Sequence, residues 1–157
     1  MGLILLVIVL LISARSIASF VIEYHWWREM GQFSTWVSML LYRVTPAVAA
    51  SLLAFAVLLL THARALRFAG VKRVSSKLYT RIAAAVLFLT GGFIGASTVD
   101  TWTVVRFFGG RNLPAEATSW QDAVFGQPLS FYLFDLPFFG VLRGYVLALT
   151  IAVAVVF

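Results

Sequence analysis

Four long apolar stretches dominate this sequence of 157 residues and restrict what it can fold into. About 20 apolar residues in a helix cross the hydrocarbon core of a bilayer, because each residue adds about 1.5 Å of length. Short polar segments separate the stretches, as loops separate membrane spans. We therefore predict an all-α integral membrane bundle, one domain over residues 1–157 with four transmembrane helices at about 2–22, 37–62, 82–104 and 136–157.

The composition supports a membrane location. The chain is 62% hydrophobic and 11% charged, whereas soluble domains carry roughly 25% charged residues. Too few polar residues remain to cover a surface that faces water, so lipid must contact much of the protein. Between the spans, we expect the segments Gly31–Tyr42 and Ser119–Phe134 to form short interfacial helices in the outer loops, and Pro46 to lie in the first turn of the second span.

The loop between the second and third spans predicts the orientation, because residues 63–81 hold six cations and no carboxylate. Positively charged loops stay in the cytoplasm. This loop and both chain termini should therefore face the cytoplasm, with all acidic residues on the outer side. The cations are Arg64, Arg67, Lys72, Arg73, Lys77 and Arg81.

The net charge of +6 would favour nucleic-acid binding in a soluble protein. Here the orientation rule explains the same cations, so we expect no nucleic acid among the partners. Membrane lipid and other integral membrane proteins are the expected partners, and the basic loop could contact anionic headgroups. The chain has no cysteine, which excludes disulfides and thiolate metal sites.

The two ends of the sequence raise the questions of signal-peptide cleavage and of truncation. A cleaved signal peptide is the alternative to a first span, because Ser16-Ile17-Ala18 loosely resembles a cleavage site. No Lys or Arg precedes the apolar run, however, as a signal peptide requires. No polar residue follows the last span, and this pattern favours a sequence truncated from a longer protein.

Small residues recur every four positions on two spans. The pairs are Gly91 with Gly95 and Gly92 with Ala96 on the third span, and Gly140 with Gly144 on the fourth. Such pairs let helix backbones approach closely in lipid. We expect them to form packing surfaces, either within the bundle or against a partner.

Two arginines, Arg15 and Arg143, fall inside predicted spans. A charge within the hydrocarbon is costly, so each should extend to the interface or pair with a carboxylate, for which Asp100 and Asp135 are the nearest candidates. A substrate or ion pathway lined by the two arginines is the alternative.

Cofactor and catalytic motifs are sparse. His25 and His62 flank spans at opposite predicted membrane faces, so each could ligate a pigment or haem only singly, and we predict neither a cofactor nor a metal site. Phosphate loops, metalloprotease motifs and paired intramembrane aspartates are absent from the sequence. We therefore expect no enzymatic activity.

An aromatic segment precedes the last span, where Asp122 to Phe138 read DAVFGQPLSFYLFDLPF. Aromatic rings favour the membrane interface, and glycine and proline bend the backbone. We expect this segment to lie at the interface and to dock another membrane protein. Its motif residues are Phe125, Gly126, Phe131, Tyr132, Phe134 and Pro137.

The same segment resembles the signature of a bacterial multi-pass membrane family, the uncharacterised protein family numbered 0182 in the UPF series. Trp102 with Arg106-Phe107-Phe108 is similar to the approach to that signature, and Tyr24-His25-Trp26-Trp27 with Gly31 and Arg43 is similar to the family's first outer loop. The family usually has Asp-Pro before Phe-Gly and a second Asp before the Phe-Tyr pair. In this chain Ala123 and Leu129 stand in those neighbourhoods.

The resemblance implies the amino-terminal membrane portion of a longer protein with further spans and a large extracytoplasmic region. It implies no reaction, substrate or catalytic residue. From the residues themselves we expect a non-catalytic membrane subunit or anchor. Two alternatives remain: a transport component with a polar path at Arg15 and Arg143, and an accessory subunit of a photosynthetic or respiratory complex, with His25 or His62 holding a cofactor.

Overall fold

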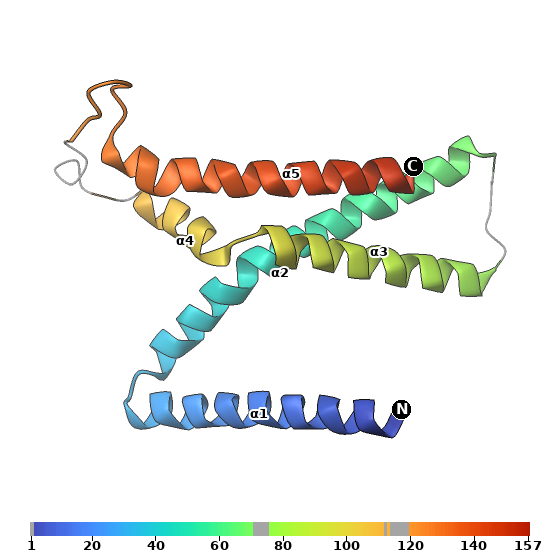
Figure 1. Ribbon diagram of the computed structural model, residues 1–157, viewed down its shortest axis with the longest axis horizontal. Coiled ribbons are helices and arrows are strands. Elements are labelled where there is room, and N and C mark those ends of the chain that lie inside the picture. The colour runs from blue at the N-terminus through green and yellow to red at the C-terminus, as the bar shows by residue number, and fades with distance from the viewer. Residues whose placement is uncertain (1, 71–75, 112, 114–119) are drawn as a thin grey trace. The chain divides into compact units, whose positions relative to one another are not determined.

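The computed structural model describes the backbone of residues 2–70, 76–111, 113 and 120–157, and the side chains of these residues from 13 onward. Within these residues the fold is all-helical apart from one isolated bridge between Gln121 and Pro128, and the all-α prediction is confirmed. The elements in Figure 1 are α1 (Gly2–Glu29), α2 (Phe33–Phe68), α3 (Lys77–Thr98), α4 (Thr101–Gly110), the π-helical turn η2 (Phe131–Asp135) and α5 (Leu136–Val156).

Three helical segments in the described residues are long and apolar enough to cross a membrane: Phe33–Phe68, Lys77–Thr98 and Phe131–Val156. The first predicted span lies on α1, and most of its side chains fall outside the described residues, as do Lys72 and Arg73 of the basic loop. Three membrane-compatible helices are therefore a property of the fold, and the fourth span stays a prediction.

The chain divides into two compact units, Met1–Leu41 and Tyr42–Phe157. In the first, Gly31 has a φ of 68°, a left-handed conformation that glycine adopts at low cost, and it sits in the turn between α1 and α2. Aromatic side chains of both helices then meet. The Trp36 ring lies 5.3 Å from the ring of Phe20 and 6.0 Å from that of Tyr24, and Trp36 is buried.

Helix α2 corrects two expectations. The segment Gly31–Tyr42 forms no separate interfacial helix, because α2 begins at Phe33 and continues unbroken to Phe68. Pro46 is therefore interior to this helix and not in its first turn. A proline removes only one backbone donor, here the one that would reach the Tyr42 carbonyl. With 36 residues, α2 is about 54 Å long and extends well beyond a hydrocarbon core of about 30 Å.

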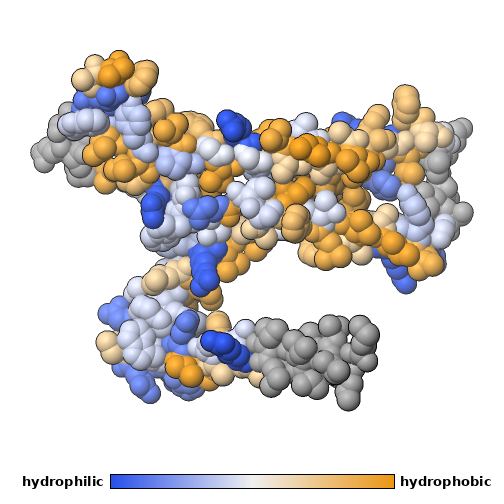
Figure 2. Space-filling view, viewed as in Figure 1, coloured by the Kyte–Doolittle hydropathy of each residue, from blue (hydrophilic) through white to orange (hydrophobic). Residues whose placement is uncertain are grey.

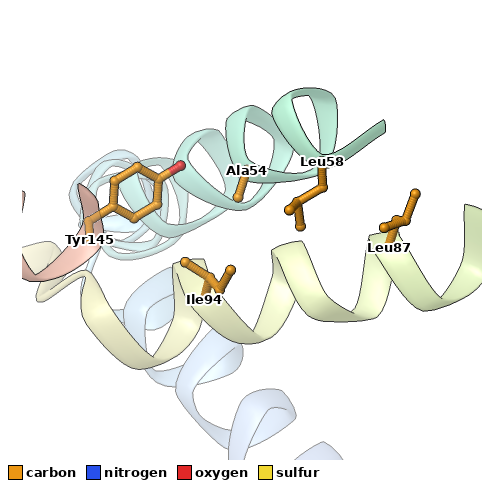
Figure 3. Packing of buried hydrophobic residues seen from close by; sticks show 5 residues of the cluster. All are labelled: Ala54, Leu58, Leu87, Ile94 and Tyr145. Atoms are coloured by element: carbon orange, nitrogen blue, oxygen red, sulfur yellow. The ribbon is translucent and has the colours of Figure 1, made fainter. Parts of the chain in front are cut away.

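The second unit is built around a core between α2, α3 and α5. Ala54 and Leu58 of α2, Leu87 and Ile94 of α3 and Tyr145 of α5 are its buried members (Figure 3). The Tyr145 hydroxyl donates a hydrogen bond of 2.8 Å to the carbonyl oxygen of Ala50 on α2. Tyr145 thus ties α5 to α2 through one polar contact inside an apolar core.

A break separates α3 from α4 within the range 82–104 that we expected as one continuous helix. Val99 and Asp100 are extended, with ψ values of 105° and 103°. The Asp100 carboxylate then accepts hydrogen bonds from the Trp102 and Thr103 amides and from the Thr103 hydroxyl, which caps α4. The chain changes direction here because a well-capped new helix begins.

Helix α4 packs on the start of α5 through stacked aromatic rings. Phe107 and Phe138 lie face to face, with ring centroids 3.8 Å apart and planes inclined by 7°. The Arg111 guanidinium lies 4.5 Å from the Phe107 ring centroid, within the range of a cation–π interaction. These contacts bring α4 alongside the beginning of α5.

Candidate functional site

The predicted glycine pairs have two different surroundings. A Cβ at Gly91 would lie 2.7 Å from the Phe55 backbone nitrogen, and a Cβ at Gly95 would lie 2.7 Å from that of Ser51. These two glycines let α3 touch the backbone of α2. A Cβ at Gly92, Gly140 or Gly144 would meet nothing within 4 Å, so those three are not used for packing within the described residues.

Helix α5 consequently has two faces. One packs on the core through residues such as Tyr145, Ala148, Leu149 and Ala152. The other is an apolar stripe with spacings of three and four residues, which place its members on one side of a helix. Figure 2 shows how apolar residues cover the surface over α5. We call this stripe the glycine face of α5, and it consists of Gly140, Gly144, Leu147, Ile151 and Val155.

The loop before α5 also differs from expectation. Residues 120–128 form a hairpin and the helical conformation begins only at Leu129, while Ser119 lies outside the described residues. The Asp122 amide donates to the Gln127 carbonyl at 2.9 Å, and the Leu129 amide donates to the Trp120 carbonyl at 3.3 Å. Gly126, with a φ of 64°, makes the turn. Aromatic content alone could not distinguish this hairpin from an interfacial helix.

Asp122 holds the hairpin in shape. Its carboxylate accepts hydrogen bonds from the Tyr132 hydroxyl at 2.8 Å and from the amides of Phe125 and Val124 at 3.1 and 3.3 Å. These bonds, that of Tyr132 first, lower the pKa of Asp122 below its usual value of 3.8. The ionised carboxylate is the form that stabilises this turn.

The motif aromatics fall into inward and outward groups. Phe131, Tyr132 and Phe134 are half-buried, and the Phe134 ring covers Gly110 of α4, where an added Cβ would lie 2.8 Å from it. Pro137 sits in the first turn of α5. At the hairpin tip, however, Val124 is 79% exposed and Phe125 is 74% exposed. The outward-facing part of the motif is therefore this tip.

The candidate intramembrane charges do not pair with one another in the described part of the second unit. Arg143 is exposed on α5, and it makes no ion pair there with Asp135 or Asp100. Asp100 is engaged as the cap of α4, and the hydrogen bond from the Thr103 hydroxyl is the main cause that lowers its pKa. Arg15 is exposed on α1 in the first unit.

Each histidine lies against a tyrosine. The His25 ring meets the Tyr24 ring edge-on at 5.4 Å, and His62 Nε2 lies 3.1 Å from the Tyr79 hydroxyl. Among the residues that the structure describes, no group of three or more His, Cys, Asp or Glu side chains could hold a metal ion.

One feature was not predicted from the sequence. An apolar groove of about 960 Å³ lies between α2, α4 and α5, with Val99 among its lining residues. It depends on the break between α3 and α4, which redirects the chain toward the start of α5. The one available signal was Asp100 followed by Thr101, a typical helix start within an otherwise apolar stretch.

The comparisons with known proteins agree with the resemblance seen in the sequence. All of residues 1–157 match the family described as "Uncharacterised protein family (UPF0182)". A relative named "UPF0182 protein" from Solibacter usitatus (strain Ellin6076) is 54% identical over 142 residues, which are 90% of this chain and 16% of the relative. The chain thus spans about a sixth of that relative's length. No solved structure gives a significant match. On this evidence the chain belongs to the uncharacterised protein family UPF0182.

Proposed function

We propose that this chain is a non-catalytic membrane portion that anchors a larger protein and packs against other membrane helices. Its contact surfaces would be the glycine face of α5 and the hairpin tip formed by Val124 and Phe125. The observation that carries the proposal is the open space beside Gly140 and Gly144, whereas α2 occupies the space beside Gly91 and Gly95.

Contact with lipid chains alone does not explain the small residues of the glycine face. Small residues allow close approach of another backbone, and helices in lipid associate through such packing because apolar burial gives no drive there. The exposed side chains that continue the stripe, Leu147, Ile151 and Val155, would contact the same neighbouring helix. The hairpin tip, at the end of the same helix, would extend this contact beyond the membrane.

The proposed topology has four spans in the bacterial cytoplasmic membrane, with both chain termini and loop 63–81 in the cytoplasm. The described cations of that loop support it. Arg64 and Arg67 lie near the end of α2, and Lys77 and Arg81 lie in the first turns of α3. Positive charge thus gathers where these two helices meet the same loop, as expected of a cytoplasmic face.

A spin label tests the glycine face in the family-length protein, by which we mean the protein at the length of its relative. Leu147 and Leu52 are matched positions, since both are leucines near the middle of a predicted span, with exposed fractions of 61% and 53%. We expect a label at Leu147→Cys to be less accessible to oxygen than one at Leu52→Cys. The double substitution Gly140→Leu/Gly144→Leu should restore accessibility at 147 by displacing the neighbouring helix.

Two controls complete this experiment. Val146→Leu enlarges an exposed α5 residue outside the stripe and should leave the label at 147 unchanged, because adjacent helix positions do not face each other. Equal oxygen accessibility at positions 147 and 52, unaffected by the two leucines, would show that only lipid covers the glycine face.

A further inference from the structure

The groove between α2, α4 and α5 occupies one half of the helical bundle. Its lining residues run from Tyr42 to Leu53 on α2 and from Phe138 to Tyr145 on α5. Phe138 lies in the first turn of α5, and Tyr145 is near the middle of that helix. The groove therefore belongs to the leaflet on the side of the hairpin.

The length of the groove matches the thickness of one leaflet. The eleven steps from Tyr42 to Leu53 cover about 16 Å of helix. Half of a hydrocarbon core is about 15 Å. Near the middle of the bundle the groove closes, because Tyr145 is hydrogen-bonded to Ala50 and the following residues of α5 pack on the core. A partner helix that spans the membrane would need a continuous surface of about twice this length.

The lining is apolar and open to a hydrocarbon chain. It consists mainly of Ala, Val, Leu, Pro and Phe side chains. Its side-chain hydroxyls are those of Tyr42, Thr45 and Tyr145, and that of Tyr145 already has a partner. A lining with so few polar groups suits a ligand part that needs no hydrogen bonds.

Two arginines adjoin lining residues at the hairpin end of the groove. The Arg111 guanidinium lies 5.5 Å from the ring centroid of Phe108, a lining residue. Arg43 follows Tyr42, the first lining residue of α2, in the sequence. The charge of Arg106, also on α4, is instead partly offset by its interaction with Asp100. Of the carboxylates at this end, Asp100 is engaged as a helix cap, and Asp135 makes no ion pair in the described residues.

We propose that this groove binds the acyl chains of an anionic phospholipid from the leaflet on the hairpin side, with the phosphate held by Arg111 and Arg43. An apolar groove as long as one leaflet is thick, with arginines adjoining its end, is complementary to an anionic phospholipid. The site is independent of the proposed function, because Gly140 and Gly144 lie on a different face of α5 from the lining residues Val141, Leu142 and Tyr145.

Photocrosslinking in nanodiscs tests the proposal with the family-length protein. The probe is phosphatidylglycerol with a diazirine in one acyl chain, and phosphatidylcholine with the same diazirine is the reference lipid. We expect mass spectrometry to place adducts on lining residues such as Leu53 and Leu142. Both lipids carry a phosphate, but the choline cation of phosphatidylcholine offsets its charge. Phosphatidylglycerol has a net negative charge and should therefore give the higher yield, by about fivefold for each arginine that interacts with its headgroup.

Matched variants separate the groove from ordinary lipid contact. Ala49 lines the groove, whereas Ala56, two turns further along α2, does not, and both are exposed. Ala49→Phe should abolish the groove adducts, and Ala56→Phe should leave them unchanged. Arg111→Gln with Arg43→Gln should lower the phosphatidylglycerol yield more than the phosphatidylcholine yield and so remove the preference for phosphatidylglycerol.

Three results would overturn the proposal. Adducts as frequent at Leu60 as in the groove would mean that lipid contacts the whole surface alike. Absence of groove adducts in folded protein would mean that another helix covers the groove. An unchanged lipid preference in the arginine variants would refute the phosphate site.

Discussion

Gly91, Gly92 and Gly95 share one helix, yet only two of them are required for its packing. The four-residue spacing predicted two pairs, Gly91 with Gly95 and Gly92 with Ala96. Neighbouring positions point in directions about 100° apart, so both pairs cannot face α2. Which pair does so depends on the rotation of α3, and sequence spacing does not determine that rotation.

Gly95→Ala should destabilise the bundle by about 1–3 kcal/mol, because the new methyl group would overlap the backbone of Ser51. Gly92→Ala should be neutral or stabilising by up to about 1 kcal/mol, since its Cβ enters open space. Unfolding of the two variants in detergent, followed by circular dichroism, measures the difference. Equal stability would show that α3 does not contact α2 through Gly95.

Arg143 shows a second limit of reasoning from single residues. Its position in an apolar stretch predicted that it extends to the interface or pairs with a carboxylate. Asp100, one candidate partner, caps α4 instead, and the sequence-based range 82–104 did not show the helix start that this cap requires. Extension of Arg143 to the interface stays a prediction.

Among the elements, the 120–128 hairpin has a shape that depends on one ionised group. The Asp122 carboxylate bonds two amides of the turn and the Tyr132 hydroxyl, and these bonds lower its pKa. A lowered pKa in the folded state means that the ionised form stabilises the fold. This contribution is complete above the usual value of 3.8 and is lost as the pH falls through the lower folded value.

We therefore expect the Val124 and Phe125 amides to remain protected from hydrogen exchange at pH 5 and above, and to lose protection only below the usual pKa of about 4. Asp122→Asn should remove this pH dependence, because an amide side chain does not ionise. A midpoint of the transition above pH 4, or one that persists in Asp122→Asn, would contradict the role of the carboxylate.

Helix identity was predictable from the sequence where apolar runs were long. Within the described residues, the second and fourth predicted ranges correspond to α2 and α5. The segments around them were less predictable. Helix α2 includes the segment that we expected as a separate interfacial helix, since no glycine or proline lies between Phe33 and Thr45. Pro46 removes one backbone hydrogen bond and crowds the preceding turn, but it does not end the helix. The hairpin depends on amide pairing between residues five and nine positions apart, which leaves no helical or strand periodicity in so short a segment.

For the molecule as a whole, membrane location follows from apolar helices that expose large side chains. Leu89, Phe93 and Val155 are each more than two-thirds exposed on helices able to span a bilayer. Exposure of such an apolar surface to water is unfavourable, whereas contact with lipid chains avoids this cost in free energy. The groove could not be predicted from the sequence, because it forms where three helices meet beside the extended residues between α3 and α4.

The sidedness of the bundle is the claim on which the proposed topology depends. These 157 residues contain no cysteine, so once any cysteines in the rest of the longer protein are replaced, a single introduced cysteine can be labelled. Ala69, after the end of α2, and Ala123, in the hairpin, are both exposed and allow the same conservative substitution to cysteine. A membrane-impermeant maleimide is added to spheroplasts that carry either variant of the family-length protein. We expect labelling of Ala123→Cys in intact spheroplasts and labelling of Ala69→Cys only after lysis. Labelling of Ala69→Cys from outside, or of both residues from the same side, would contradict the proposed orientation.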